Sequence, residues 1–318
     1  MTTTPSYAIG IDFGGTSVKL ARVLSDGTIA ARAVFDTTPG VESWLDAVEA
    51  ALVPLRQGAE GECAGLGVGV PGFVDFHRGF IHDLTNVPGW TAVPLAEKMK
   101  ARFGLPAVIE NDVNAMAAGE CAFGAGKGFK NAVFITLGTG VGGGILIDGK
   151  IFRGAFSMAG ELGHVSIDKD GIASPMGFGG VEQYVGNAKI SAYALSRIDA
   201  GENGEAILRK ACGKRGAVTP KAIALAAQEG DPLAKSVFDY VADCLATMIA
   251  SVAYVLQPEA FIVGGGVSNA GEVLFAPLNA HLQRRLSPHF FSRLKLLRAA
   301  LGNDAGVVGC AALAAHLA

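Results

Sequence analysis

The most informative stretch of this chain is Ile9-Gly-Ile-Asp-Phe-Gly-Gly-Thr-Ser-Val-Lys19. A short apolar strand runs into an Asp, two glycines and a Thr, and the chain then turns back into a second strand. Gly14 and Gly15 lack a Cβ, so the backbone can adopt positive φ and a phosphate can approach its N–H groups. Thr16 adds a hydroxyl donor, and Asp12 is placed to hold Mg²⁺ through water. The stretch therefore predicts a nucleotide-phosphate site.

The same pattern returns in residues 133–149, Val-Phe-Ile-Thr-Leu-Gly-Thr-Gly-Val-Gly-Gly-Gly-Ile-Leu-Ile-Asp-Gly. Each copy predicts a strand, a glycine turn, a second strand and a hairpin turn, at Asp26-Gly27 in the first copy and Asp148-Gly149 in the second. One glycine turn would be explained equally well by an ordinary β-hairpin. Two copies favour two similar lobes that face each other across a cleft.

Composition limits the function further. The 318 residues suit two domains with a large core, and 50% apolar with 17% charged residues predicts a compact soluble protein. The net charge of −3 and the lack of a basic stretch argue against a nucleic-acid partner. The five cysteines are odd in number and lack metal-type spacing, which predicts free thiols in a reducing compartment.

The sequence also argues against a membrane. Its start lacks the basic and apolar regions of a signal peptide. The longest uncharged helical run, residues 244–256, is predicted to be too short to span a bilayer and to form a buried core helix. We therefore expect no membrane partner and a cytoplasmic location.

Strands and helices alternate along the whole chain, which predicts a mixed α/β protein. We expect helices over 41–56, 92–103, 112–122 and about 305–317, and strands over 66–70, 106–110 and 260–263. Thr219-Pro220 and Asp231-Pro232 each place an N-cap residue before a proline at the first helical position. The glycine-rich residues 123–129 resemble a linker or hinge.

Polar residues gather where the predicted strand 106–110 gives way to a helix, a common place for active residues in α/β folds. Asp112 could accept the proton of an attacking hydroxyl. The alternative is that Asn111 or Asp112 only caps the helix. Two phosphate-type loops in the same chain favour the catalytic base.

Three further groups of residues are candidates for ligand binding, but each is weak evidence when taken alone. Glu161 and His164 lie three residues apart and could reach one polyhydroxyl ligand if the turn is helical, or they could be a surface Glu and a core His. Glu182 is equally weak by itself. Gly264-Gly265-Gly266 follow a predicted strand and allow either the close approach of adenine or ribose or a tight packing turn.

Taken together, these pieces resemble the ROK family of sugar kinases, most closely its glucokinase branch, from about residue 7 to 315. Eight segments occur in the family's order, which makes the resemblance specific. They are Asp12-Phe-Gly-Gly-Thr-Ser-Val-Lys19, Gly67-Val-Gly-Val-Pro-Gly72, Asn86-Val-Pro-Gly-Trp90, Glu110-Asn-Asp-Val-Asn114, Gly138-Thr-Gly140, Glu161-Leu-Gly-His164, Gly264-Gly-Gly-Val267 and Asn303-Asp-Ala-Gly306.

The resemblance implies a two-lobed, actin-like ATPase fold with ATP and Mg²⁺ in a central cleft, and it suggests a homodimer. Residues 1–120 would form the small lobe together with a C-terminal helix at about 305–318, and residues 121–304 the large lobe. Asp112 would be the catalytic base. The other sugar-binding residues implied are Gly72, Asn86, Asn111, Glu161, His164 and Glu182. The nucleotide-binding residues implied are Asp12, Gly14, Gly15, Thr16, Lys19, Gly138, Thr139, Gly140, Gly264, Gly265 and Gly266.

One segment departs from the family pattern. The family usually carries a His and a Cys-x-Cys-Gly-x-x-Gly-Cys-x-Glu segment that binds structural zinc. Aligned on Glu182, the three cysteine positions hold Ala173, Pro175 and Gly180. Because zinc normally needs four thiolate or imidazole ligands, His164 alone cannot hold it. We therefore expect no zinc, and a loop over 168–181 that is ordered by other means or mobile.

The activity implied by the resemblance is ATP-dependent phosphorylation of a hexose, with glucose as the first expectation. N-acetylhexosamine or fructose as the acceptor, and polyphosphate as the donor, remain open. Some relatives are sugar-responsive repressors with a helix-turn-helix domain before the first phosphate loop. Asp12 lies only eleven residues from the start, so we expect no such domain. A non-catalytic actin-like scaffold is a third alternative.

Overall fold

The computed structural model describes residues 7–84 and 87–316. The chain divides into two compact units, of which the first comprises Met1–Lys130, Gly144–Gly160 and Ala299–Ala318, and the second Asn131–Gly143 and Glu161–Arg298. The sequence places the boundary after residue 120 and gives residues 144–160 to the large lobe. The division instead puts residues 121–130 and 144–160 with the first unit.

The first unit contains a five-stranded sheet in the order β3-β2-β1-β4-β7. Strands β1, β4 and β7 run parallel, whereas β2 and β3 are antiparallel neighbours. The strands of this unit are β1 (Tyr7–Phe13), β2 (Ser17–Leu24), β3 (Ile29–Asp36), β4 (Cys63–Val70), β5 (Gly72–Asp75), β6 (Phe80–Leu84), β7 (Ala107–Asn111) and β10 (Lys150–Ile151). Parallel pairing brings the carboxyl ends of β1, β4 and β7 to one edge.

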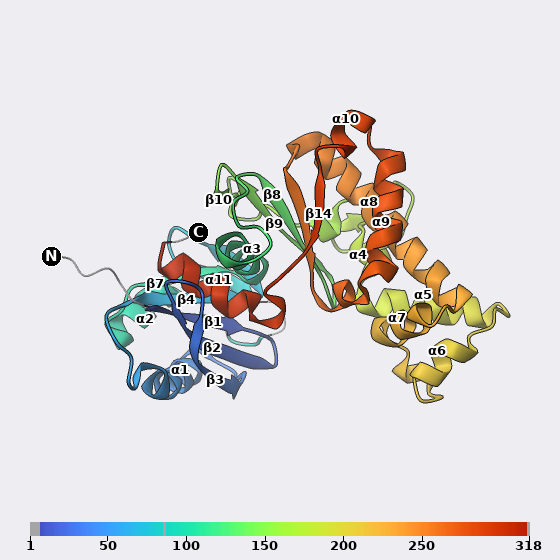
Figure 1. The fold of residues 1–318 in the computed structure, drawn as a ribbon. Helices are drawn as coiled ribbons and strands as arrows, with labels where there is room; N and C mark the ends of the chain where they lie inside the picture. Colours follow the sequence, from blue (N-terminus) through green and yellow to red (C-terminus); the bar gives the residue numbers. More distant parts are fainter. Residues whose placement is uncertain (1–6, 85–86, 317–318) are drawn as a thin grey trace. The chain divides into compact units, whose positions relative to one another are not determined.

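The helices of the first unit are α1 (Val41–Arg56), α2 (Leu95–Phe103), α3 (Asp112–Phe123) and α11 (Ala305–Ala314), preceded by the short 3₁₀ turn η4 (Gly302–Asp304). Helix α11 packs on β1, β4 and α3 (Figure 1). The approach is backbone to backbone, because a Cβ at Gly10 or Gly67 would lie 1.8 Å from a carbonyl oxygen of the helix. The C-terminal helix α11 belongs to the first unit.

In the second unit, β13 (Ala260–Gly264) runs parallel to both β8 (Ala132–Leu137) and β14 (Lys295–Arg298). Strand β9 (Val141–Ile147) follows β8 after a glycine turn and continues into the first unit. The remaining elements are η1 (Leu162–His164), β11 (Ala173–Ser174), β12 (Gly177–Phe178), α4 (Glu182–Val185), α5 (Asn187–Asp199), α6 (Glu205–Lys210), η2 (Arg215–Ala217), α7 (Pro220–Gln228), α8 (Pro232–Leu256), η3 (Gly266–Ala270), α9 (Glu272–Arg285) and α10 (Pro288–Phe291).

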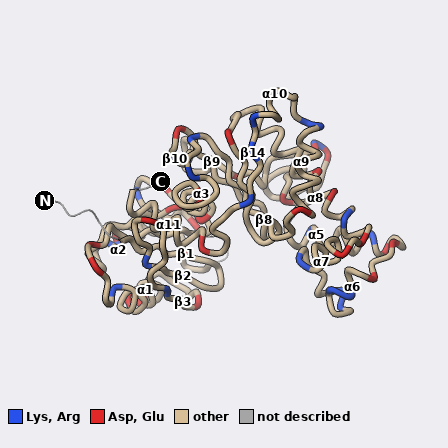
Figure 2. Tube along the Cα trace, viewed as in Figure 1, with Lys and Arg blue, Asp and Glu red and all other residues tan. Residues whose placement is uncertain are grey.

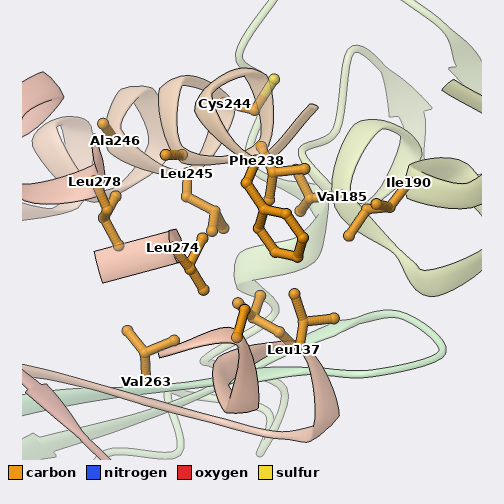
Figure 3. Packing of buried hydrophobic residues seen from close by; sticks show 14 of the residues in the cluster. Leu137, Val185, Ile190, Phe238, Cys244, Leu245, Ala246, Val263, Leu274 and Leu278 are labelled. Atoms are coloured by element: carbon orange, nitrogen blue, oxygen red, sulfur yellow. The ribbon is translucent and has the colours of Figure 1, made fainter. Parts of the chain in front are cut away.

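Helix α8 forms the centre of the second unit's core. Phe238 and Leu245 are almost completely buried, and they lie among side chains from the sheet and from α9, including Leu137 and Leu274 (Figure 3). The run 244–256 is only the second half of this 25-residue helix. The whole helix is long and apolar enough to cross a membrane, so the expectation that length excludes a membrane span is wrong. In the structure, 56% of its most apolar window is buried. The expectation of a buried core helix is confirmed.

The predicted elements are found close to their expected bounds. Thr219 and Asp231 cap α7 and α8 as expected, since each side chain accepts a hydrogen bond from the third residue on. Helix α2 begins at Leu95 instead of residue 92, because Ala92 has a φ of 57° and Pro94 occupies the N-cap position. The internal repeat is also confirmed, since β1–β2 and β8–β9 are each strand, glycine turn and strand.

Acidic and basic residues are interspersed along the trace of each unit (Figure 2). This distribution agrees with the small net charge of −3.

Candidate functional site

The predicted site residues of the first unit lie at the carboxyl ends of its parallel strands. The register pairs Asp12 of β1 with Gly69 of β4, and Gly69 with Glu110 of β7. Asn111 ends β7 and Asp112 begins α3, while Gly72 opens β5 directly after β4. This strand edge thus collects four segments that are far apart in the sequence.

The turn between β1 and β2 is closed by the Gly14 N–H, which donates to the Ser17 carbonyl at 3.0 Å. Thr37 holds it from outside: its hydroxyl donates to the Gly14 carbonyl at 2.7 Å and its N–H to the Thr16 carbonyl at 3.0 Å. Gly15 and Thr16 are exposed, and a Cβ at Gly15 would meet nothing within 4 Å. The turn therefore presents accessible backbone N–H groups on a fixed frame, as a phosphate loop requires.

Asp12 is the acidic group of this turn. Burial raises the pKa of its carboxyl, and the nearby Lys19 ammonium, 3.8 Å away, partly offsets that rise. The carboxyl also lies against the start of α11, since a Cβ at Gly306 would sit 2.8 Å from it. A mostly buried carboxylate with one cation 3.8 Å away fits a hydrated Mg²⁺, which needs only one or two carboxylates besides substrate phosphates.

Asn111 caps α3. Its Oδ1 accepts the N–H groups of Val113 at 2.9 Å and Asn114 at 3.2 Å, and its Nδ2 donates to the Gly72 carbonyl at 3.4 Å. Asp112 is therefore not the N-cap; its Oδ1 accepts the N–H of Val113 at 2.9 Å. Of the two capping assignments left open by the sequence, the structure gives the cap to Asn111.

The predicted residues of the second unit surround another glycine turn. The Gly138 N–H donates to the Gly140 carbonyl at 2.9 Å, and the Asn187 N–H donates to the Gly138 carbonyl at 2.9 Å. Glu182 Oε2 accepts the N–H of Val141 at 2.9 Å. A Cβ at Gly140 would lie 2.1 Å from that oxygen, so a side chain there would displace the Glu182 carboxylate. Glu182 thus supports the glycine turn, a contact that the sequence did not indicate. Thr139 is exposed at the turn.

Gly264 is the last residue of β13 and pairs with Thr136 of β8, and Gly265 and Gly266 follow the strand. Gly265 has a φ of 83°, and a Cβ there would lie 2.3 Å from the Leu137 carbonyl oxygen. A side chain is therefore excluded at Gly265 by the packing of the turn. Gly265 and Gly266 are exposed, so the same turn leaves its backbone open to a ligand.

Glu161 and His164 flank the 3₁₀ turn η1, which confirms a helical turn between them. Glu161 Oε2 lies 3.7 Å from His164 Nε2, with side-chain exposures of 49% and 28%. The pair is thus accessible to a polar ligand, and His164 is not a fully buried core histidine.

The loop over 168–181 is held without zinc ligands. Its short hairpin β11–β12 is closed by the Gly179 N–H to the Ile172 carbonyl at 2.9 Å. The Ile172 N–H donates to the Tyr184 hydroxyl at 3.1 Å, and Ser174 Oγ donates to the Gly177 carbonyl at 3.2 Å. Among residues 7–84 and 87–316, no three His, Cys, Asp or Glu side chains gather as a metal-binding group.

The structure thus brings the predicted residues together as two groups, one in each unit. Asn86 lies outside the described residues. No local pattern indicated a role for Glu110, which is 3% exposed, or singled out its partner Arg153. The signal for Glu110 was a charged residue at the end of an apolar strand, where only a buried partner can compensate it.

Comparison with known proteins identifies the relatives of this chain. The model of the ROK family matches residues 8–316. A glucokinase from Streptomyces coelicolor is 38% identical over 96% of this chain and 96% of its own length, and one from Halalkalibacterium halodurans is 36% identical over 95% and 93%. A solved ROK family glucokinase from Streptomyces griseus, in complex with glucose and AMPPNP, has 38% identity and a TM-score of 0.81, with 96% of this chain and 98% of that chain covered.

These matches confirm the fold expected from the sequence, the two-lobed actin-like ATPase fold of ROK sugar kinases. They also confirm the resemblance, because the match spans nearly the full chain. The chain belongs to the ROK family.

Proposed function

We propose that this protein is a hexose kinase that transfers the γ-phosphoryl group of ATP to glucose and forms glucose 6-phosphate. The observation that carries the proposal is the full-length similarity to glucokinases, together with a glucose- and AMPPNP-bound structure of the same fold. The glycine turns at 14–16 and 138–140 supply backbone donors for phosphates, and each is held by bonds from its own unit.

Asp112 is the proposed catalytic base. It lies at the first position of α3, and Asn111 provides the cap, so the Asp112 carboxylate is not consumed as the N-cap. In this role it takes the proton of the sugar 6-hydroxyl as the oxygen attacks phosphorus. The amide Nδ2 of Asn111 carries a second hydrogen that can donate to a sugar hydroxyl. Glu161 and His164 are the proposed hydroxyl-binding residues of the second unit, with Gly72, Asn86 and Glu182.

Phosphoryl transfer needs alignment and charge neutralisation more than covalent help from the protein. Asp12 would hold Mg²⁺ through water, and the metal would neutralise charge on the phosphates. Gly14, Gly15, Thr16, Lys19 and the turn Gly138–Gly140 are proposed to bind the phosphates. Gly264, Gly265 and Gly266 are proposed to face the nucleoside, since their turn leaves the backbone open.

We also propose that the protein works without structural zinc, as a homodimer in the cytoplasm, with no nucleic-acid or membrane partner. The bonds within residues 168–181 support the first point, because they close the loop through backbone and hydroxyl groups. All five cysteines are free, which fits a reducing compartment. Metal analysis of the purified protein tests the zinc proposal, and stoichiometric zinc would refute it.

A sugar and donor panel tests the activity. Purified protein is incubated with glucose, mannose, fructose or an N-acetylhexosamine, and with ATP or polyphosphate, and the sugar phosphate is quantified. We expect glucose 6-phosphate with ATP and Mg²⁺, and little product without Mg²⁺. A higher kcat/KM for another sugar, or for polyphosphate, would replace glucose or ATP in the proposal. No phosphorylation of any sugar would refute a kinase.

A further inference from the structure

Glu110 is a buried carboxylate directly before the Asn111–Asp112 corner. Only 3% of the residue is exposed. Its Oε1 accepts the N–H of Asn111 at 2.9 Å and Nδ2 of Asn114 at 3.2 Å. Its Oε2 accepts Nε of Arg153 at 2.7 Å. Both oxygens are therefore occupied, one by the corner itself and the other by a cation 43 residues away.

Arg153 is fixed from three sides. Besides the bond to Glu110, its Nη1 donates to the Ile151 carbonyl at 3.1 Å, and its guanidinium carbon lies 3.5 Å from the centre of the Phe76 ring. Only 16% of its side chain is exposed. A planar, stacked and hydrogen-bonded guanidinium has a defined position that a flexible ammonium would lack.

We propose that Glu110 and Arg153 are positioning residues for the phosphoryl transfer, which hold the Asn111–Asp112 corner in its reactive geometry. The proposal rests on the proposed function of Asp112. The pair touches the corner through the backbone N–H of Asn111 and through Asn114, which in turn donates its N–H to the capping oxygen of Asn111. A closed set of bonds thus sets where α3 begins and where Asp112 points.

The Arg153 guanidinium also compensates the buried charge of the Glu110 carboxylate beside the Asn111–Asp112 corner. Without Arg153, the Glu110 carboxylate would be a buried charge with no cation, next to the proposed base. A buried pair that loses one partner is strongly unfavourable, so the corner would rearrange to bring in water or to move Glu110 outward. Because a misplacement of about 1 Å can cost about 100-fold in rate, such a rearrangement should reduce catalysis.

The test uses the full-length protein and the variants E110Q, R153M and R153K. Two matched controls are available in the same unit. E120Q makes the same change at another buried glutamate of α3, and R102M makes the same change at an arginine paired with Asp46 and Glu49 on the surface. Glucose affinity is measured by calorimetry, folding by thermal unfolding, and kcat and KM by product formation per glucose-binding site.

We expect E110Q and R153M to lose about 10- to 100-fold in kcat/KM, with most of the loss in kcat, because the base must be aligned while sugar contacts can re-form. R153K should fall between R153M and wild type, since it keeps a cation near Glu110 but loses the planar stack. E120Q should lower thermal stability without lowering kcat, and R102M should change neither.

Three results would overturn the proposal. E110Q and R153M could keep kcat/KM within about twofold of wild type. Their losses could follow stability alone, with kcat per glucose-binding site unchanged, as is expected for E120Q. R153K could behave like R153M in stability yet like wild type in kcat. If wild-type protein phosphorylates no sugar, the proposed function fails first and this inference with it, whereas active wild type with unaffected variants refutes the inference alone.

Discussion

A buried glutamate lies beside each end of helix α3, and the two carboxylates are stabilised by different partners. Glu110, next to the N-terminal end, pairs with the Arg153 guanidinium. Glu120, near the C-terminal end, is 0% exposed and accepts only backbone N–H groups among the bonds recorded for it: Ala125 at 2.8 Å, Ala300 at 3.0 Å and Leu301 at 2.7 Å. We propose that the Glu110 end serves catalysis, and that the Glu120 end, with Ala125, Ala300 and Leu301, is a joint that serves stability.

The hydrogen bonds of Glu120 join two segments of the chain, one that leads into the second unit and one that returns from it. Ala125 lies in the glycine-rich segment that leads to Asn131, and Ala300 and Leu301 follow the return from Arg298. Neutral N–H donors stabilise a carboxylate without adding a cation. The N-terminal corner, in contrast, keeps its charge balanced beside Asp112.

The largest expected effect comes from removing the proposed base at the N-terminal end. Asp112→Asn should lower kcat by about 10²–10⁴-fold while glucose affinity changes little, since Asn keeps the size and a hydrogen-bonding oxygen. Steady-state kinetics with calorimetric glucose binding checks this. Asp26→Asn, an exposed change in a hairpin turn of the same unit, is the control and should keep full activity. Near-normal turnover in the Asp112 variant would remove the base assignment and the contrast between the two ends.

Breaking the C-terminal joint should act on stability. Glu120→Gln replaces a carboxylate that accepts three N–H bonds with an amide that can satisfy only part of them, so the free energy of unfolding should fall by about 1.5–3 kcal/mol. Urea unfolding followed by circular dichroism measures the change. An unchanged unfolding midpoint would show that the Glu120 bonds do not contribute to stability. A large loss of kcat would show that Glu120 also affects catalysis, against the proposed difference between the two ends.

The thiol next to Glu120 reports whether the joint is closed. Burial, and then the Glu120 charge, raises the pKa of Cys121 to about 11. Roughly one thiol in a thousand is then ionised at pH 8, so alkylation should be slow. Cys212 is exposed and should be labelled first in a time course followed by mass spectrometry. Glu120→Gln should speed the labelling of Cys121, and equal rates for both cysteines in wild type would contradict the closed joint.

The smallest effect on stability is expected from breaking an exposed ion pair of the first unit, Arg32–Asp304. Arg32 donates two bonds to Asp304, at 2.6 and 2.8 Å, and holds the pKa of that carboxyl below its usual value. The stabilisation is present above the unfolded-state pKa of about 3.9 and is lost as the pH falls through the lower folded-state pKa. Because the pair is exposed, Asp304→Asn should cost less than about 1 kcal/mol at pH 7 and nothing once the pH lies below both pKa values. If Asp304→Asn lowered the free energy of unfolding at pH 7 by more than about 2 kcal/mol, exposure would not limit the contribution of this ion pair to stability.

Local sequence patterns were enough to predict most of the helices and strands. Glycine turns, strand patterns and the Thr219 and Asp231 caps act within a few residues, so a local pattern is enough to predict them. The eight ordered segments determined the family for the same reason, because each is a short local string. The Asn111–Asp112 corner was also located by its local pattern, a strand that runs into a helix.

Tertiary structure alone decided which of two adjacent polar residues caps α3 and which partners compensate the buried charges. Glu110 meets Arg153 across 43 residues, Glu120 meets Leu301 across 181, and Glu182 meets Val141 across 41. A charged residue in an apolar stretch signals that a partner is needed, but nothing local says which one. The tertiary fold makes that choice, because it brings segments that are far apart in the sequence into contact.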